Sequence, residues 1–163
     1  MVMTTAGGLS SASTDAAFDE FVADARGRLR RALIGAVGID RADDAAAEAV
    51  AWAFEHRDEL AEMGNPLGYL YRVGQSRVRR RRSPAARLRL LHDESMRIPG
   101  VEPGLVPALS SLSPSQRTSV WLAHGCQWTH AEIATAMDIS PSTVATHVRR
   151  GLEHLRNELG VTS

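Results

Sequence analysis

The stretch from Trp128 to Leu159 constrains the fold of this chain more than any other part of its sequence. Thr129, with Glu132 three residues later, has the pattern of a capping box at the start of a helix. Asp138 falls in the turn that follows, where one residue must take a left-handed conformation that Asp tolerates. Ser140 then fits the N-cap of a second helix, with a proline at the favoured first position. These signals predict a helix-turn-helix with a long second helix.

The second helix is predicted to have one buried stripe and one polar face. Apolar residues recur at spacings of three and four, which is typical of a helix face turned to a core: they are Val144, Val148, Leu152, Leu155 and Leu159. Small hydroxyl and basic groups lie off this stripe near the start of the helix. Such an end can enter a DNA major groove, so the candidate DNA-binding residues are Ser142, Thr143, Thr146, His147, Arg149 and Arg150. The alternative is an ordinary helical hairpin with a solvated polar face.

Composition excludes several other classes of protein. No apolar run approaches the roughly 18 residues that span a membrane, and the N-terminus lacks the pattern of a signal peptide, so we expect a cytoplasmic protein. Cys126 is the only cysteine, which excludes an intramolecular disulfide. His124, Cys126 and His130 are close in sequence, but no fourth ligand with motif spacing accompanies them, and we interpret them as packing and surface residues. No catalytic constellation is evident, and we expect neither an enzyme nor a cofactor or metal.

Charge is distributed unevenly along the chain. All the basic residues are arginines, and residues 1–63 carry twelve acids against six of them. Residues 72–89 contain eight arginines and no acid, which favours contact with a phosphate backbone over a merely solvated helix end. The candidate nucleic-acid residues in this strip are Arg72, Arg77, Arg79, Arg80, Arg81 and Arg82.

Helical periodicity extends through the first half of the chain and predicts an all-α protein of two small helical domains joined by a Pro/Gly linker. After a disordered tail over 1–13, one helix should run from residue 13 or 14 to Gly38. A second should start with Asp40 as N-cap and continue to Leu60, and a third should follow Asn65 and its proline. The expected domains are 14–91 and 105–163, with the linker at 92–104.

The second of these helices should have a core side and an acidic side. Val50, Ala53, Phe54 and Leu60 are expected to face the core. Asp43, Asp44 and Glu48 lie on the acidic side, together with Glu55. Acids near a helix start also favour the helix dipole and solubility, so the acidic side alone does not establish a binding surface.

The chain resembles the small two-domain sigma factors of bacterial RNA polymerase, the extracytoplasmic-function (ECF) group. The resemblance covers roughly residues 15–160 and is strongest in region four, where Leu-x-x-Leu-x-x-x-x-Arg, then Ala-Glu-Ile-Ala, Ile-Ser and Thr-Val recur. The matching residues are Leu109, Leu112, Arg117, Ala131–Ala134, Ile139, Ser140, Thr143 and Val144. Region two diverges more: for example, Ala47 stands before Glu48, where the family commonly has Gln.

The resemblance implies a transcription initiation factor that directs core RNA polymerase to promoter −35 and −10 elements. The six residues of the second helix of the helix-turn-helix would read the −35 element, and the arginine strip would hold the −10 region. Asp43, Asp44 and Glu48 would bind polymerase. The implied partners are double-stranded promoter DNA, core RNA polymerase and, in addition, an anti-sigma factor.

Two other functions fit the sequence. One is a stand-alone helix-turn-helix regulator of the LuxR type, because SPSTVATHV and the ending ELGV also resemble that class. It would bind two-fold sites as a dimer. The other is a sigma-like interaction protein that sequesters a regulator and does not initiate transcription.

Overall fold

The computed structural model describes residues 8–80 and 104–160, and the secondary structure within these ranges is helical throughout. The N-terminal domain consists of α1 (Gly8–Val37), α2 (Ile39–Glu55), α3 (Arg57–Ala61) and α4 (Pro66–Arg80). The C-terminal domain consists of α6 (Leu105–Ser111), α7 (Pro114–Val120), the π-helical turn η1 (Trp121–Gly125), α8 (His130–Met137) and α9 (Pro141–Leu159). The all-α prediction is confirmed. The predicted linker and the ends of the chain lie almost wholly outside the described residues.

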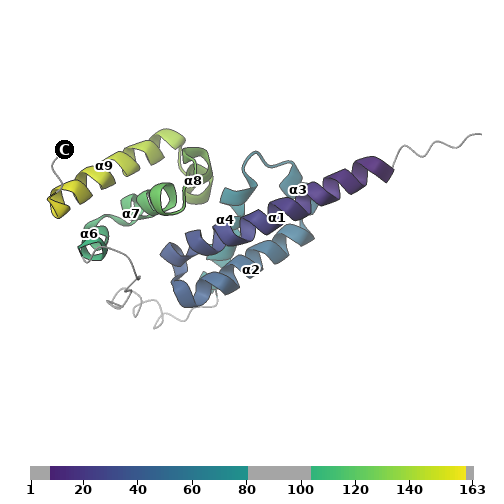
Figure 1. Cartoon of the computed structure of the whole chain (residues 1–163), viewed down its shortest axis with the longest axis horizontal. Coiled ribbons are helices and arrows are strands. Elements are labelled where there is room, and N and C mark those ends of the chain that lie inside the picture. Colours follow the sequence, from purple (N-terminus) through teal and green to yellow (C-terminus); the bar gives the residue numbers. More distant parts are fainter. Residues whose placement is uncertain (1–7, 81–103, 161–163) are drawn as a thin grey trace, which may run out of the picture.

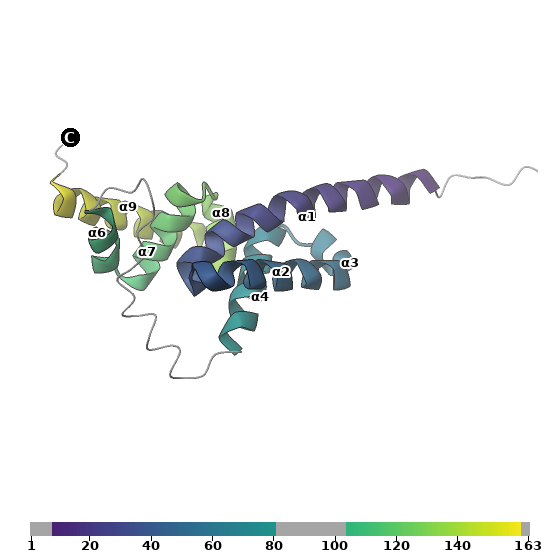
Figure 2. The ribbon, with the colours of Figure 1, turned by 60° about the horizontal axis from the view of Figure 1, so that its bottom comes forward.

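α1 and α2 lie side by side and run in opposite directions, and α4 packs against both of them (Figures 1 and 2). Gly38 joins α1 and α2 directly at a φ of 86°, which glycine adopts without a steric penalty. Because of this direct connection α2 begins at Ile39, and the prediction that Asp40 is its N-cap is wrong. α1 begins at Gly8, so residues 8–13 are helical and the expected tail is shorter. No proline in that stretch interrupts the helix.

The second predicted helix is divided in two. His56 leaves helical geometry between α2 and α3, with φ −124° and ψ 39°, so the helix does not run unbroken to Leu60. Ala53 and Leu60 are buried as expected, but Phe54 is 56% exposed. Its ring instead packs edge-on against Phe18 of α1, with 5.3 Å between ring centroids. The small alanines of α2 occupy the core side, so a larger side chain is displaced to the rim.

α4 begins as predicted, with the Asn65 side chain accepting a hydrogen bond from the Gly68 amide at 3.3 Å. Leu67, Leu70 and Tyr71 are buried. Gly74 allows α4 to lie very close to α2, because a Cβ at this position would be 2.7 Å from the carbonyl oxygen of Ala45. The core of the N-terminal domain is thus formed by small residues of α2 between the larger ones of α1 and α4.

The helices of the C-terminal domain have well-defined caps. Ser113 and Gln116 form a capping box at the start of α7, and Gly160 ends α9 at a φ of 64°. Val144, Val148 and Leu155 are buried, as the predicted stripe requires. Leu159, the last residue of that stripe, is 37% exposed.

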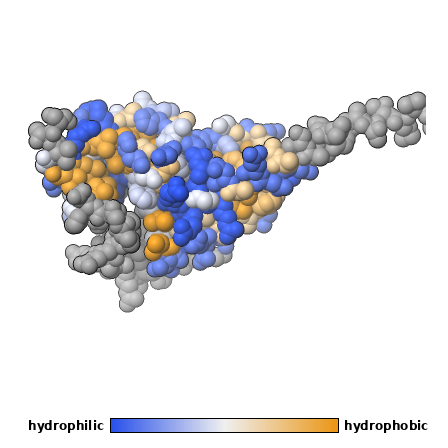
Figure 3. Space-filling view, viewed as in Figure 1, coloured by the Kyte–Doolittle hydropathy of each residue, from blue (hydrophilic) through white to orange (hydrophobic). Residues whose placement is uncertain are grey.

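The two domains share one continuous apolar core, in which buried residues of α1, α2 and α4 pack together with those of η1, α8 and α9. The rings of Tyr71 on α4 and Trp128 before α8 meet edge-on, 5.6 Å apart. The face in Figure 3 has no single apolar patch. Hydrophobic groups lie over the C-terminal helices, and hydrophilic groups cover the middle of the molecule. Each large apolar side chain buried in such a core contributes roughly 1.5–3 kcal/mol.

Across the described part of the chain, none of the helices has both the length and the apolarity needed to cross a membrane.

Candidate nucleic-acid interface

The helix-turn-helix formed by α8 and α9 has the geometry that its sequence predicts. The Thr129 amide donates to the Glu132 carboxylate at 2.8 Å, and the Glu132 amide donates back to the Thr129 hydroxyl at 3.2 Å. Asp138 takes the left-handed conformation in the turn, at φ 59° and ψ 46°. Ser140 accepts from the Thr143 amide at 3.1 Å and so caps α9. The caps hold α9 at a fixed angle to α8.

The polar face of α9 is accessible over its first three turns. Ser142, Arg149 and Arg150 are exposed, and Thr143, Thr146 and His147 are partly exposed. The Thr146 hydroxyl donates to the backbone carbonyl of Ser142 at 3.1 Å. Arg149 pairs with Glu153 at 2.8 Å, one turn further along α9. All six predicted DNA-binding residues of α9 therefore lie on one solvent-accessible surface, whose positive charge is partly neutralised at Arg149.

The arginine strip is described only in part. Arg72 lies 3.6 Å from the carboxylate of Asp138, in the turn of the other domain. Arg77 pairs with Glu48 of α2 at 3.1 Å. Arg79 and Arg80 belong to α4, but their side chains are not described, and Arg81 and Arg82 lie outside the described residues. The structure thus assigns ionic partners to the first two arginines of the strip.

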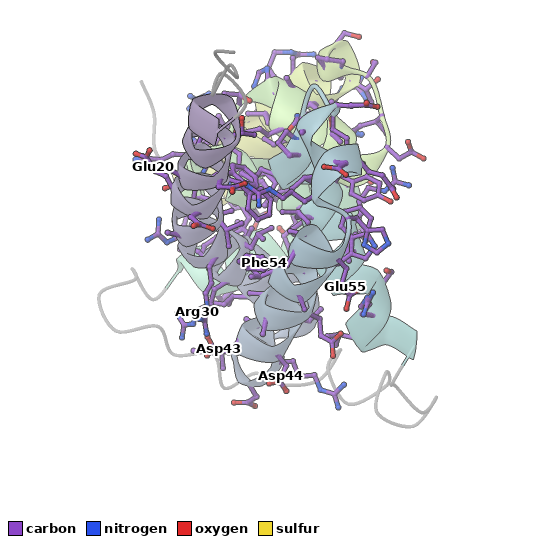
Figure 4. The ribbon with its side chains drawn as sticks, turned by 90° about the vertical axis from the view of Figure 1, so that its right-hand side faces the viewer. Glu20, Arg30, Asp43, Asp44, Phe54 and Glu55 are labelled. Atoms are coloured by element: carbon purple, nitrogen blue, oxygen red, sulfur yellow. The ribbon has the colours of Figure 1, made fainter. Side chains whose placement is uncertain are left out.

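The acidic residues of α2 lie on its outer surface, on the side of the molecule that Figure 4 shows. Asp43 and Asp44 are exposed at the start of the helix, and the Arg30 guanidinium of α1 pairs with Asp43 at 2.7 Å. Glu48 is half-buried, since it contacts Arg77 of α4. The three predicted polymerase-binding residues therefore share one helix, although two of them already have an arginine partner.

An aromatic cluster that the sequence analysis did not single out lies where α2 meets α4. The rings of Trp52 and His56 are stacked with 4.2 Å between centroids, and Tyr69 lies 5.0 Å from Trp52. All three are partly exposed, and Tyr69 precedes Arg72 by one helical turn on α4. The spacing of four between Trp52 and His56 on a helix was the available signal. Partly exposed aromatic faces beside a cation can stack on nucleobases.

The described residues contain no group of three or more His, Cys, Asp and Glu side chains that could hold a metal ion. Cys126 is buried, whereas His124 and His130 are exposed. Burial raises the pKa of the Cys126 thiol from 9.0 to about 11, with the Arg31 guanidinium acting weakly in the opposite direction. A protonated, buried thiol is a poor nucleophile and a poor metal ligand.

Comparison with protein families matches residues 105–155 to "Sigma-70, region 4", a stretch that runs from α6 through most of α9. Over these residues the C-terminal domain is similar to the sigma-70 region 4 family. The match includes the helix-turn-helix and the whole candidate recognition surface, so the region 4 domain is the better defined half of this chain.

The fold of the chain as a whole is that of a two-domain sigma factor. Its likeness to RpoE in the co-crystal structure of that sigma factor with the anti-sigma factor NepR from Bartonella quintana has a TM-score of 0.64 at 18% sequence identity. The match covers 90% of this chain and 98% of RpoE. No curated protein sequence matches the chain. The resemblance to sigma factors that the sequence predicts is thus confirmed, by family for the region 4 domain and by fold for the N-terminal domain.

Proposed function

We propose that this protein initiates transcription as an ECF-type sigma factor, by binding core RNA polymerase and directing it to promoter −35 and −10 elements. The observation that carries the proposal is the region 4 match over residues 105–155. The fold likeness to RpoE, over 90% of the chain, supports a role in the same process for the N-terminal domain. Recruitment of polymerase and capture of a DNA strand require no covalent chemistry by the protein. We also infer that the protein acts in the cytoplasm.

The region 4 domain would read the −35 element through α9. The Ser142 amide at the start of α9 could donate to a phosphate, because Pro141 has no N–H and Ser140 caps the Thr143 amide. Arg150 is exposed and its side chain can reach base edges or the backbone. Shorter-range contacts would come from Ser142, Thr143, Thr146 and His147.

The N-terminal domain would hold the −10 element along α4. Arg72 and Arg77 begin a cationic surface there, and the remainder of the arginine strip extends it along the sequence. The cluster of Trp52, His56 and Tyr69 stands beside it and is suited to stacking on unpaired bases, at about 1–3 kcal/mol per stacked base. After the −10 element melts, its exposed single strand would bind there.

The outer face of α2 would bind polymerase. Asp43 and Asp44 are exposed, and Phe54 adds an exposed aromatic group on the same helix. An acidic surface near the start of the helix with an exposed aromatic group near its end fits a basic, partly apolar partner. An anti-sigma factor is a further proposed partner, since RpoE was crystallised in complex with NepR.

The test is transcription by core RNA polymerase with and without this protein, on DNA from upstream of its own gene, with permanganate footprinting of melted bases. A new start site with a melted −10 region is expected. Duplex binding without polymerase association would instead favour the stand-alone regulator. The variant with Asp43→Ala, Asp44→Ala and Glu48→Ala should lose polymerase association while retaining duplex binding.

A further inference from the structure

Helix α4 packs along α8 so closely that one of its arginines lies beside the turn of the helix-turn-helix. A Cβ at Gly68 of α4 would lie 2.6 Å from the carbonyl oxygen of Glu132 and 2.8 Å from Cβ of Thr135, so this approach requires glycine. Arg72 follows Gly68 by one helical turn. Its guanidinium lies 3.6 Å from the carboxylate of Asp138, which follows Thr135 by three residues. The packing of the two helices therefore fixes the position of Arg72 relative to the turn.

A groove of about 640 Å³ lies between α4 and the start of α9, and Arg72 lines it together with Ser140 and Pro141. Among the described residues that line this groove, Arg72 has the one positive charge and Asp138 the one negative charge. The side chain of Arg72 is 45% exposed and that of Asp138 is 79% exposed. An exposed pair of this kind is weak, so a stronger anion from solution can engage the guanidinium.

The polar face of α9 begins at the same groove and is open to solvent with the two domains packed together as described, an arrangement that we call docked. Ser142, Arg149 and Arg150 are exposed in it. The hydrogen bond of Ser142 with Ser140 and the ion pair of Arg149 with Glu153 are both made within the helix-turn-helix. The face that would enter a major groove is therefore accessible in the docked arrangement.

A duplex on this face would bring phosphates to the side of Arg72. In DNA complexes of helix-turn-helix proteins, the start of the second helix meets base edges while the first helix crosses the phosphate backbone. Asp138 is unfavourable at that place, because its carboxylate repels phosphate. The turn needs a residue that tolerates a φ of 59°, and Asp138 meets this need but adds a negative charge. The guanidinium from α4 offsets this charge.

We propose that Arg72 completes the duplex-binding surface of the helix-turn-helix by contacting a backbone phosphate beside the major groove that α9 enters. The surface then consists of both domains in their docked arrangement. This role of Arg72 is separate from the −10 contact, and it rests on the proposed function of α9 in duplex recognition. The partner is duplex DNA, which Arg72 recognises by charge and not by base sequence.

Fluorescence anisotropy of the full-length chain with a duplex from upstream of its own gene, over a salt series, tests the contact. Arg72→Ala should lower the affinity and reduce the slope of log K against log salt by about 0.9, the value for one phosphate. An unrelated duplex of equal length should lose affinity by the same factor, because a phosphate contact carries no sequence information. Arg72→Lys retains the charge and should retain the slope.

Arg30→Ala is the matched control. The Arg30 side chain is 48% exposed and pairs with a carboxylate, that of Asp43, at 2.7 Å, so it resembles Arg72 in exposure and pairing but joins α1 to α2. Its replacement should leave the affinity and the salt slope at their wild-type values. An equal change in the Arg30→Ala and Arg72→Ala variants would reflect net charge alone and would refute a contact at Arg72.

The variant Asp138→Asn distinguishes a phosphate contact from neutralisation of the acid. Asparagine tolerates the left-handed conformation, so the turn is retained. In this background Arg72→Ala should again reduce the salt slope by about 0.9. If the effect of Arg72→Ala disappears once residue 138 is uncharged, Arg72 only neutralises Asp138 and the phosphate contact is refuted.

Core polymerase binding, measured in parallel, tests the proposed function separately. If the full-length chain binds no duplex although its complex with core polymerase does, the docked chain is not a duplex-binding form and the proposal about Arg72 is overturned. If the chain binds duplex with the expected effects of Arg72→Ala but does not bind core polymerase, the sigma assignment fails and the contact at Arg72 is supported.

Discussion

Arg72 of α4 and Asp138 of the helix-turn-helix approach to 3.6 Å, across the boundary between the two domains. Both side chains are substantially exposed, so the charge pair adds little to stability. The backbone of Asp138 has a larger effect, because its φ of 59° is unfavourable for most residues.

Replacing Asp138 should separate these two contributions. Asp138→Ala should lower the free energy of unfolding by about 1–2 kcal/mol, because alanine tolerates the left-handed conformation poorly. Asp138→Asn keeps a residue that tolerates it and removes only the charge, so its effect should be below about 1 kcal/mol. Urea unfolding of the three proteins provides the measurement. Equal losses in both variants would show that the ion pair matters more than the backbone conformation.

Glu153 should weaken DNA binding by holding Arg149, to which it pairs at 2.8 Å. Glu153→Gln frees the guanidinium and removes a negative charge near the phosphates, so duplex affinity should rise. If Arg149 then contacts a phosphate, the slope of log K against log salt should steepen by about 0.9. Fluorescence anisotropy over a salt series measures both quantities. Arg149→Ala in the same background should abolish the steeper salt slope, and a slope that stays steeper without Arg149 would exclude Arg149 as the contact.

Gly74 should not tolerate alanine, although alanine is the better helix former. The added Cβ would meet the carbonyl oxygen of Ala45 at 2.7 Å, and backbone cannot yield as a side chain can. Overpacking of this kind costs about 1–3 kcal/mol. The comparison variant Gly151→Ala meets a side-chain methyl group of Val120 at 2.7 Å, and a side chain can shift by a few tenths of an ångström more easily than backbone. Thermal unfolding should therefore show a larger fall in Tm for Gly74→Ala, and the reverse order would contradict the rigid α2–α4 contact.

Cys126 should make stability depend on pH above 9. Its pKa is raised by burial from 9.0 to about 11, so the folded state binds the thiol proton more tightly than the unfolded state does. This stabilisation is complete below pH 9 and is lost as the pH rises through 11, by about 2–3 kcal/mol in total. Urea unfolding at pH 8 and pH 11 should show this extra loss in the wild type relative to Cys126→Ala. Identical losses would show that the thiol titrates normally.

Local signals in the sequence were sufficient to predict the helix-turn-helix. The caps at Thr129 and Ser140 and the turn at Asp138 depend on residues within a few positions of each other, so their chemistry can be predicted without knowledge of the fold. The same holds for Asn65 at the start of α4. The recognition surface of α9 follows from these caps and from one buried stripe.

Features that depend on contacts distant in sequence were not predictable. The interdomain contact requires Gly68 to meet Glu132, which lies in the other domain. Phe54 was expected in the core, but the helical period alone cannot show that alanines fill that side of α2 and exclude a large ring. The cluster of Trp52, His56 and Tyr69 was missed because Tyr69 joins it only once α4 has packed against α2.

The ion pair between Glu48 and Arg77 makes one guanidinium common to the two surfaces of the N-terminal domain, the acidic face of α2 and the basic edge of α4. A protein that engages Glu48 through a cation of its own must compete with Arg77, and the displaced arginine becomes available to an anion. Nucleic acid that engages Arg77 would likewise remove Arg77 from Glu48. If a protein partner binds α2 and DNA binds α4 as proposed, thermodynamic reciprocity requires each ligand to strengthen the binding of the other by the same factor, and this salt bridge would couple the two binding events.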